Sequence, residues 1–425
     1  MRGFHLFITT LRSLIAFFYL YQFLVGGECL SLPRRRVNIV SPGFFNWPQT
    51  TSLSHIAPAV ETGLAAVRGR YPHINWTAEF LLSDHFKNCD GLKDNIQAEL
   101  SRWYYTQAYS AADVLTVIIT PGCYESRYMS QLAAGWDVLL ITSMDYTENM
   151  GNRNQFPSYV TTSPKTPVNG VILCALLVRM NWTRVYLLHD TSSDDYYGYQ
   201  AINLHLSMPR NCGVLLTRQQ FASASENASQ ALPFILQDFN SKSRVLLYLG
   251  APAGMRPILV EAKKQNMTYG EHVFLAITND DAADGNDGWQ AQSENDQAMR
   301  SDYQAILLVK LVDTVALAAT APMRQLVPEW RTLALSKYNN TNLKNMRIQT
   351  NVAGHTAIEL MAEAVEAANP GGWTNAPPGG KLLADQLLNR TFDLQIGKAH
   401  MLAQGQLSVQ HRTVCFDLKE AAFKV

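Results

Sequence analysis

The stretch VLTVIITPGC, residues 114–123, decides the fold. Its apolar and β-branched run, residues 114–119, predicts a strand that is covered on both faces, as strands of parallel sheets are. Pro121 and Gly122 then predict a turn at the carboxyl end of that strand. The stretch therefore favours an α/β protein built on a parallel sheet.

Strands and helices alternate outward from this stretch. Upstream, apolar residues from Ile56 to Val67 recur at helical spacing, with Ser54 as the expected N-cap. Further strands are predicted at residues 37–40, 76–82, 138–142, 184–188, 214–216, 245–249 and 273–277. Helices are predicted between them, including residues 128–134 and 171–180. Such alternation predicts parallel sheets flanked by helices, with right-handed crossovers.

The pattern changes after residue 279, where a polar loop rich in Asp, Asn and Gly begins. We expect a long helix over residues 303–317 and a second over residues 356–368. Residues 398–416 predict a short antiparallel meander. With 425 residues and 47% hydrophobic residues, the chain suits two lobes of ordinary domain size.

The charge balance excludes one class of partner. Lys plus Arg and Asp plus Glu number 35 each, and no motif that reads DNA or RNA is present. Because binding to a phosphate backbone needs a basic surface, no nucleic-acid partner is expected.

The N-terminus predicts secretion. Arg2 and Arg12 precede an apolar run at residues 14–25, followed by Gly26 and Gly27, so residues 1–27 read as a signal peptide. An uncleaved signal anchor is the alternative, but the run is short for a bilayer span. Sequons that agree with secretion begin at Asn75, Asn181, Asn227, Asn266, Asn339 and Asn389.

The cysteines favour disulfides, because an even number of them faces an oxidising compartment. They are Cys29, Cys89, Cys123, Cys174, Cys212 and Cys415. Full pairing has about fifteen solutions, and spacing alone does not choose among them. Cys174 and Cys212 flank one strand–helix unit and suit a pair, although Cys174 on an apolar helix face also suits a free core thiol. Loss of Cys29 with the signal peptide would leave Cys415 unpaired.

No sequence motif supports catalysis or metal binding. The chain has no Cys-x-x-Cys pair, nucleophile elbow, phosphate loop, dinucleotide fingerprint or His-Glu-x-x-His motif. The acidic pairs at residues 194–195 and 280–281 are expected to be solvated loop carboxylates. We therefore predict a protein that is not an enzyme and holds no metal.

A ligand is expected beyond the carboxyl ends of the strands, where backbone amides and small polar side chains are exposed. Each candidate alone is explained as well by an ordinary loop residue, so the hypothesis concerns the set. Its members are Pro121, Gly122, Thr142, Ser143, His189, Asp190, Gly250 and Asp280.

Motifs in a fixed order resemble the extracellular regions of natriuretic-peptide receptors and receptor guanylyl cyclases. They are Trp47-Pro48, the Pro-Gly-Cys turn at residues 121–123, Asn-Trp-Thr-Arg-Val at residues 181–185 and Leu-Leu-Asn-Arg-Thr-Phe at residues 387–392. The resemblance covers residues 36–425. It implies a type I periplasmic-binding-protein-like fold, whose two lobes are joined by three crossovers. The expected lobes are residues 36–158 with 278–378, and residues 159–277 with 379–425.

The resemblance also assigns roles to single residues. It implies a disulfide between Cys89 and Cys123, and a chloride held by backbone donors of Gly122 and Cys123; no other cofactor is expected. It places Trp103 in a dimer interface, although a core tryptophan explains Trp103 equally well. Thr120 stands where the family usually has glycine, and the second-lobe cysteines depart from the natriuretic positions, so the ligand is expected to differ.

These implications predict the ligand-binding region of a cell-surface receptor that binds a peptide hormone and signals through a homodimer. The alternatives are a small-molecule sensor of the same superfamily, a secreted decoy and, distantly, a secreted hydrolase. The apolar segment at residues 305–321 contains Lys310 and Asp313, which disfavour a membrane span. We expect an extracellular location, with membrane attachment only through a helix downstream of this sequence.

Overall fold

Strand β3 (Val114–Thr120) lies in the middle of a parallel sheet in the computed structural model. The structure describes residues 35–425 except 46–51, 110, 112, 124, 144–149, 163–165, 194, 252–253, 279–298, 311–319, 341–347, 369–372, 374–375, 409–411, 420–421 and 425. The predicted signal peptide and Cys29 therefore lie outside the described residues. The strand order of this first sheet is β2-β1-β3-β4-β5. Its other strands are β1 (Arg35–Pro42), β2 (Ile74–Leu81), β4 (Leu139–Thr142) and β5 (Tyr159–Thr161).

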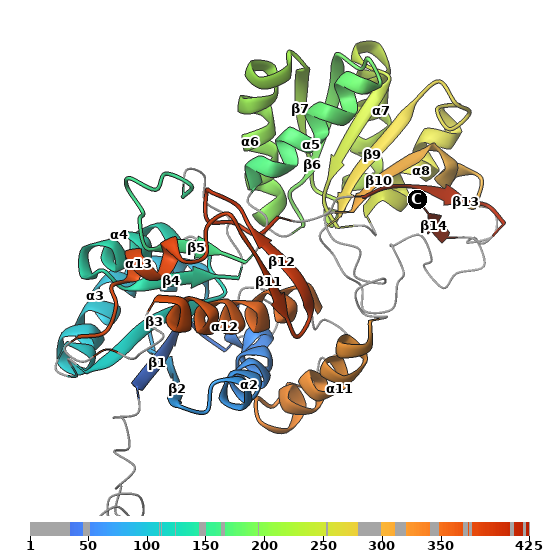
Figure 1. Ribbon diagram of the computed structural model, residues 1–425. Coiled ribbons are helices and arrows are strands. Elements are labelled where there is room, and N and C mark those ends of the chain that lie inside the picture. Colours follow the sequence, from blue (N-terminus) through green and yellow to red (C-terminus); the bar gives the residue numbers. More distant parts are fainter. Residues whose placement is uncertain are drawn as a thin grey trace, which may run out of the picture.

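Helices cover both faces of the first sheet, as the continuous apolar run of β3 predicts (Figure 1). Val117 and Ile119 pack with one group of helices, and Ile118 packs with another. The first group is α2 (Leu53–Arg70), α12 (Ile348–Ala368) and α13 (Gly380–Asp385). The second group is α3 (Cys89–Trp103) and α4 (Ser126–Trp136). Helix α2 begins earlier than expected, because its N-cap is Ser52, whose side chain accepts from the amide of Ser54.

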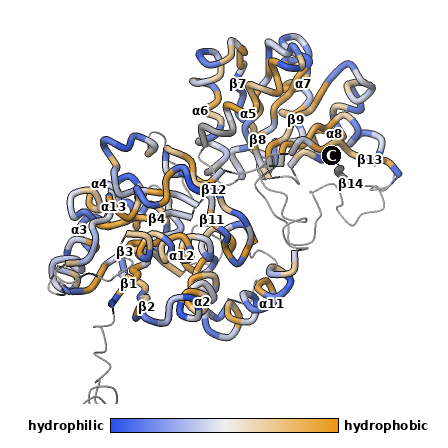
Figure 2. Tube along the Cα trace, viewed as in Figure 1, coloured by the Kyte–Doolittle hydropathy of each residue, from blue (hydrophilic) through white to orange (hydrophobic). Residues whose placement is uncertain are grey.

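A second sheet has the order β14-β13-β10-β9-β8-β6-β7. Its parallel strands are β6 (Arg184–Asp190), β7 (Leu215–Phe221), β8 (Val245–Leu249), β9 (Val273–Thr278) and β10 (Ile306–Lys310). Strands β13 (Arg412–Asp417) and β14 (Ala422–Lys424) pair antiparallel at its edge. One face is covered by α5 (Thr166–Arg179) and α6 (Asp195–Cys212), and the other by α7 (Ala228–Lys242) and α8 (Met255–Lys264). The strands of both sheets carry long apolar stretches (Figure 2).

The prediction of a helix over residues 303–317 is wrong for residues 303–310, the part that the structure describes. A short 3₁₀ turn, η3 (Asp302–Ala305), leads directly into β10. Strand β10 pairs with β9 on one side and β13 on the other, so both edges of its backbone are satisfied. A short apolar run fits a buried strand and a buried helix equally well by periodicity, and here the available strand partners decide between them.

The chain passes between the two sheets three times in the described part, after β5, β10 and the hairpin of β11 (Arg390–Leu394) and β12 (Gly397–Met401). Helix α11 (Ala321–Ser336) packs on α2 through Met323 and Trp330. The expected lobe limits need three corrections: β10 pairs in the second sheet, β5 pairs in the first, and α13 with the hairpin packs on the first. Within the described residues, no helix has the length and apolarity to cross a bilayer.

Candidate functional site

Both sheets have a topological switch point, where neighbouring strands lead into connections on opposite faces. In the first sheet this point lies between β1 and β3, and in the second between β6 and β8. Open α/β sheets bind ligands beyond the carboxyl ends of the strands at such points. The candidate site is therefore built from the residues that follow β3 and β4 in one sheet, and β6 and β8 in the other.

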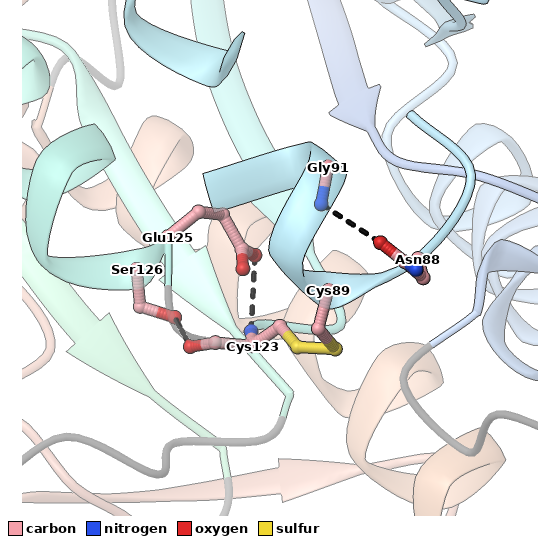
Figure 3. The surroundings of a disulfide bond; sticks show 6 residues. All are labelled: Asn88, Cys89, Gly91, Cys123, Glu125 and Ser126. Atoms are coloured by element: carbon pink, nitrogen blue, oxygen red, sulfur yellow. Dashed lines mark hydrogen bonds between the residues drawn. A yellow bond between two sulfur atoms is a disulfide. The ribbon is translucent and has the colours of Figure 1, made fainter. Parts of the chain in front are cut away.

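The turn after β3 is fastened to the start of α3. Gly122 has φ +86°, a left-handed conformation that favours glycine, and it turns the chain toward Cys123. Cys123 forms a disulfide with Cys89, the first residue of α3, with their Cα atoms 5.9 Å apart (Figure 3). Asn88 caps the same helix by accepting from the amide of Gly91 at 2.8 Å.

Glu125 closes this turn from the other side. Its side chain is fully buried, and Oε1 accepts the backbone amide of Cys123 at 3.0 Å, as Figure 3 shows. Oε2 has no hydrogen-bond partner among the described residues. Burial raises the pKa of Glu125 to about 7, although hydrogen bonds from the backbone of Glu125 and Cys123 lower it in part. Glu125 is not among the residues predicted from the sequence, and its position gives no capping signal, because its side chain does not cap α4.

The residues after β4 share the edge of the first sheet with the turn. The hydroxyls of Thr142 and Tyr159 lie 2.8 Å apart, and the amide of Ser143 donates to the carbonyl of Thr120 at 3.0 Å. Pro121, Gly122, Thr142 and Ser143 are all buried. The structure therefore brings these four predicted residues to one edge, and it holds them there through contacts within the chain.

At the edge of the second sheet, Asp190 is the centre of a polar network. Its carboxylate accepts the amides of Ser192 at 3.0 Å and Ser223 at 3.1 Å. It also accepts the hydroxyls of Ser193 at 3.0 Å, Ser223 at 2.6 Å and Tyr248 at 3.1 Å. Burial alone raises the pKa of Asp190, but these hydrogen bonds together bring it below the ordinary value. Asp190 thus ties together the loops that follow β6, β7 and β8.

Gly250 also lies at this edge, and its neighbours leave no space for a side chain at this position. A Cβ atom at Gly250 would lie 2.4 Å from the hydroxyl of Tyr248 and 2.7 Å from Cβ of Asp190. His189 is buried next to Asp190 on β6. Asp280, the remaining predicted residue, lies outside the described residues. Ser223 and Tyr248 could not be predicted from the sequence, because only the strand order brings them next to Asp190.

An aromatic cluster lies on the first lobe, next to Trp103. Trp103 itself is buried, with 5% of its surface exposed, so its side chain belongs to the core. The π-helical turn η1 (Tyr104–Ala108) follows it, and Tyr104 stacks on Trp136 with their ring centroids 4.0 Å apart. Tyr105 and Tyr109 are 59% and 70% exposed. The exposed aromatic surface at this place is therefore made by these tyrosines.

The remaining predicted residues are the second pair of cysteines, Cys415 and the sequon asparagines. Cys174 and Cys212 form a disulfide that joins α5 to α6. Cys415 on β13 is exposed and forms no disulfide with a described residue. All sequon asparagines are exposed, namely Asn75, Asn181, Asn227, Asn266, Asn339 and Asn389.

The chain matches the model of one protein family and is similar to atrial natriuretic peptide receptors. A model described as the receptor family ligand binding region matches residues 91–411. Human atrial natriuretic peptide receptor 3 is 22% identical over 375 residues, which cover 83% of this chain and 63% of that protein. Mouse atrial natriuretic peptide receptor 2 is 25% identical over 207 residues, which cover 45% of this chain and 19% of that protein. The chain thus spans less than two thirds of the length of these relatives.

Proposed function

The chain belongs to the receptor family ligand binding region family, and from this premise we propose that it is the extracellular region of a cell-surface receptor that binds a peptide and signals as a homodimer. The carrying observation is the extent of the similarity to a natriuretic peptide receptor, which includes 83% of the chain. The family match runs from α3 to the segment before β13, and so includes elements of both sheets. In this proposal the chain binds its ligand and does not transform it.

The chemistry of the two switch points supports a peptide over a small anionic ligand such as an amino acid. Backbone amides at these edges would be natural donors to a ligand carboxylate. Glu125 already accepts the amide of Cys123, and Asp190 already accepts the amides of Ser192 and Ser223. Both protein groups are acidic, so an incoming carboxylate would also meet like charge. A peptide that contacts larger surfaces of the lobes does not depend on these amides.

The aromatic cluster supports the dimer. Exposed tyrosines are enriched in protein interfaces, because they bury much area and lose little side-chain entropy. No sequon falls within residues 89–136, the segment that contains α3, η1 and α4. No N-glycan is therefore attached within this segment. We propose that Tyr105 and Tyr109 contact the second copy.

The test uses the full chain secreted from animal cells. Atrial natriuretic peptide and a size-fractionated peptide extract are the first probes, and a mixture of free amino acids is the comparison, with binding followed by calorimetry. We expect saturable heat with a peptide probe and none with amino acids. Saturable heat with the amino acids, and none with either peptide probe, would contradict the proposal.

The dimer is tested separately by sedimentation velocity with and without the bound peptide. The double variant Tyr105→Ala with Tyr109→Ala is expected to weaken self-association at least tenfold, because exposed aromatic contacts dominate interfaces. Tyr269→Ala is the matched control, since Tyr269 is 71% exposed in the segment that follows α8. A wild-type chain that stays monomeric at every concentration, with peptide bound, would overturn the dimer.

A further inference from the structure

The turn at residues 121–123 is where the resemblance implies a chloride, held by backbone donors of Gly122 and Cys123. The residues present do not fit that ion, because the amide of Cys123 already donates to Glu125. We infer that the Glu125 side chain is a built-in replacement for an external anion, so that this chain holds its turn without chloride. The inference concerns a structural contact and does not depend on which ligand the receptor binds.

The geometry leaves the Cys123 amide no room for a second acceptor. The hydrogen bond from the Cys123 amide to Glu125 Oε1 is 3.0 Å long. Glu125 has no exposed surface and Cys123 has 2%. An ion could reach the amide only by displacing a side chain that is packed in the core, and the displaced carboxyl would lose its acceptor role.

Both backbone groups of Cys123 are satisfied from within the chain. While its amide donates to Glu125, its carbonyl accepts the hydroxyl of Ser126 at 3.1 Å. The side chain is fixed by the disulfide to Cys89 (Figure 3). Three contacts that are internal to the chain thus hold the turn in place, which is the task that an external anion would otherwise share.

Glu125 disfavours chloride at the Cys123 amide in either protonation state, through its charge when ionised and through its acceptor oxygen when neutral. The ionised carboxylate repels a second negative charge in a buried site, where screening by water is weak. The neutral carboxyl still presents an oxygen that accepts the amide. Among the described residues no basic side chain forms an ion pair with Glu125 that would offset the repulsion.

The experiment compares thermal unfolding of the full secreted chain in chloride, bromide and gluconate at equal ionic strength. We expect the wild-type midpoint to be the same in all three salts. Glu125→Gln keeps an acceptor oxygen at the same place and is also expected to show no halide effect. Glu125→Ala frees the amide, and we expect a saturable halide-specific rise of roughly 2–4 °C in its midpoint.

Several outcomes would overturn the inference. A saturable chloride-specific rise in the wild-type midpoint shows that an ion binds beside Glu125 or in its place. A folded Glu125→Ala protein without any halide effect shows that the amide is no anion site. If Glu125→Ala fails to fold, the halide dependence of the unfolding midpoints of the wild type and Glu125→Gln still tests the inference. Glu329→Ala, on an exposed position of α11, controls for the loss of a carboxylate elsewhere.

Discussion

Replacing Glu125 by glutamine is expected to remove a pH dependence from the stability of the first lobe. Glu125 is fully buried, and burial raises its pKa from 4.5 to about 7. Glutamine has the same shape and keeps an oxygen for the Cys123 amide, but it does not ionise. Besides burial, only backbone hydrogen bonds from Glu125 and Cys123 act on this carboxyl among the described residues, so one substitution isolates its titration.

The sign of the effect follows from the raised pKa. The folded protein binds the proton more tightly than the unfolded chain, so stability is fully present below about pH 4.5 and falls as pH rises to about 7. Each tenfold change in proton affinity is worth about 1.4 kcal/mol, which gives a total of about 3 kcal/mol over this window. Above about pH 7 the loss is complete and stability no longer changes through this group.

The assay is urea denaturation of the full secreted chain with its disulfides intact, followed by pulse proteolysis at a series of pH values. The free energy of unfolding of Glu125→Gln minus that of the wild type is expected to rise by about 2 to 3 kcal/mol between about pH 5 and about pH 8. Glu329→Gln, exposed on α11, should show no such rise. A difference that stays constant with pH would refute the buried, titrating carboxyl.

Further predictions concern the disulfide between Cys89 and Cys123, the Asp190 network and the sequons. Cys89→Ser opens a loop with a sequence separation of 34 and should lower the free energy of unfolding by about 4 kcal/mol, whereas Cys415→Ser should leave the urea midpoint unchanged. Asp190→Asn removes a charged acceptor and should cost about 2–3 kcal/mol by urea denaturation, with wild-type stability lost as pH falls below 3.8. Asn181→Gln and Asn389→Gln should each remove one N-glycan in intact mass measurements, because both residues are exposed.

Much of the fold could be predicted from local pattern. The run at residues 114–119 specified a strand buried on both faces, and the structure confirms helices on both sides of it. The alternation of strands and helices gave the parallel class. The strand at residues 306–310 could not be separated from a helix, because an apolar run of that length carries no decisive period and its partners β9 and β13 are distant in sequence.

The positions of the candidate residues in the fold were predictable, but their contacts were predictable only in part. The rule that ligands lie beyond strand ends selected Gly122, Ser143, Asp190 and Gly250, and the structure places these residues at the carboxyl edges of the two sheets. It did not reveal that these edges are closed by contacts within the chain. Ser223 lies 33 residues from Asp190 in sequence, and their contact exists only because β6 and β7 are neighbours.

In each lobe a buried carboxyl accepts a backbone amide at the edge of the sheet, but the pKa values of the two carboxyls shift in opposite directions. The five parallel strands of each sheet follow the same order, and in both sheets a carboxyl accepts a backbone amide at the carboxyl edge. Asp190 is surrounded by hydroxyl and amide donors, which keep it ionised, whereas Glu125 has the Cys123 amide and a second oxygen without a described partner. Between about pH 5 and about pH 7 Glu125 therefore changes charge, while Asp190 stays ionised. The difference between the two pKa shifts cannot be predicted from residue type alone, because each shift depends on how many hydrogen-bond donors the folded chain brings to the carboxyl.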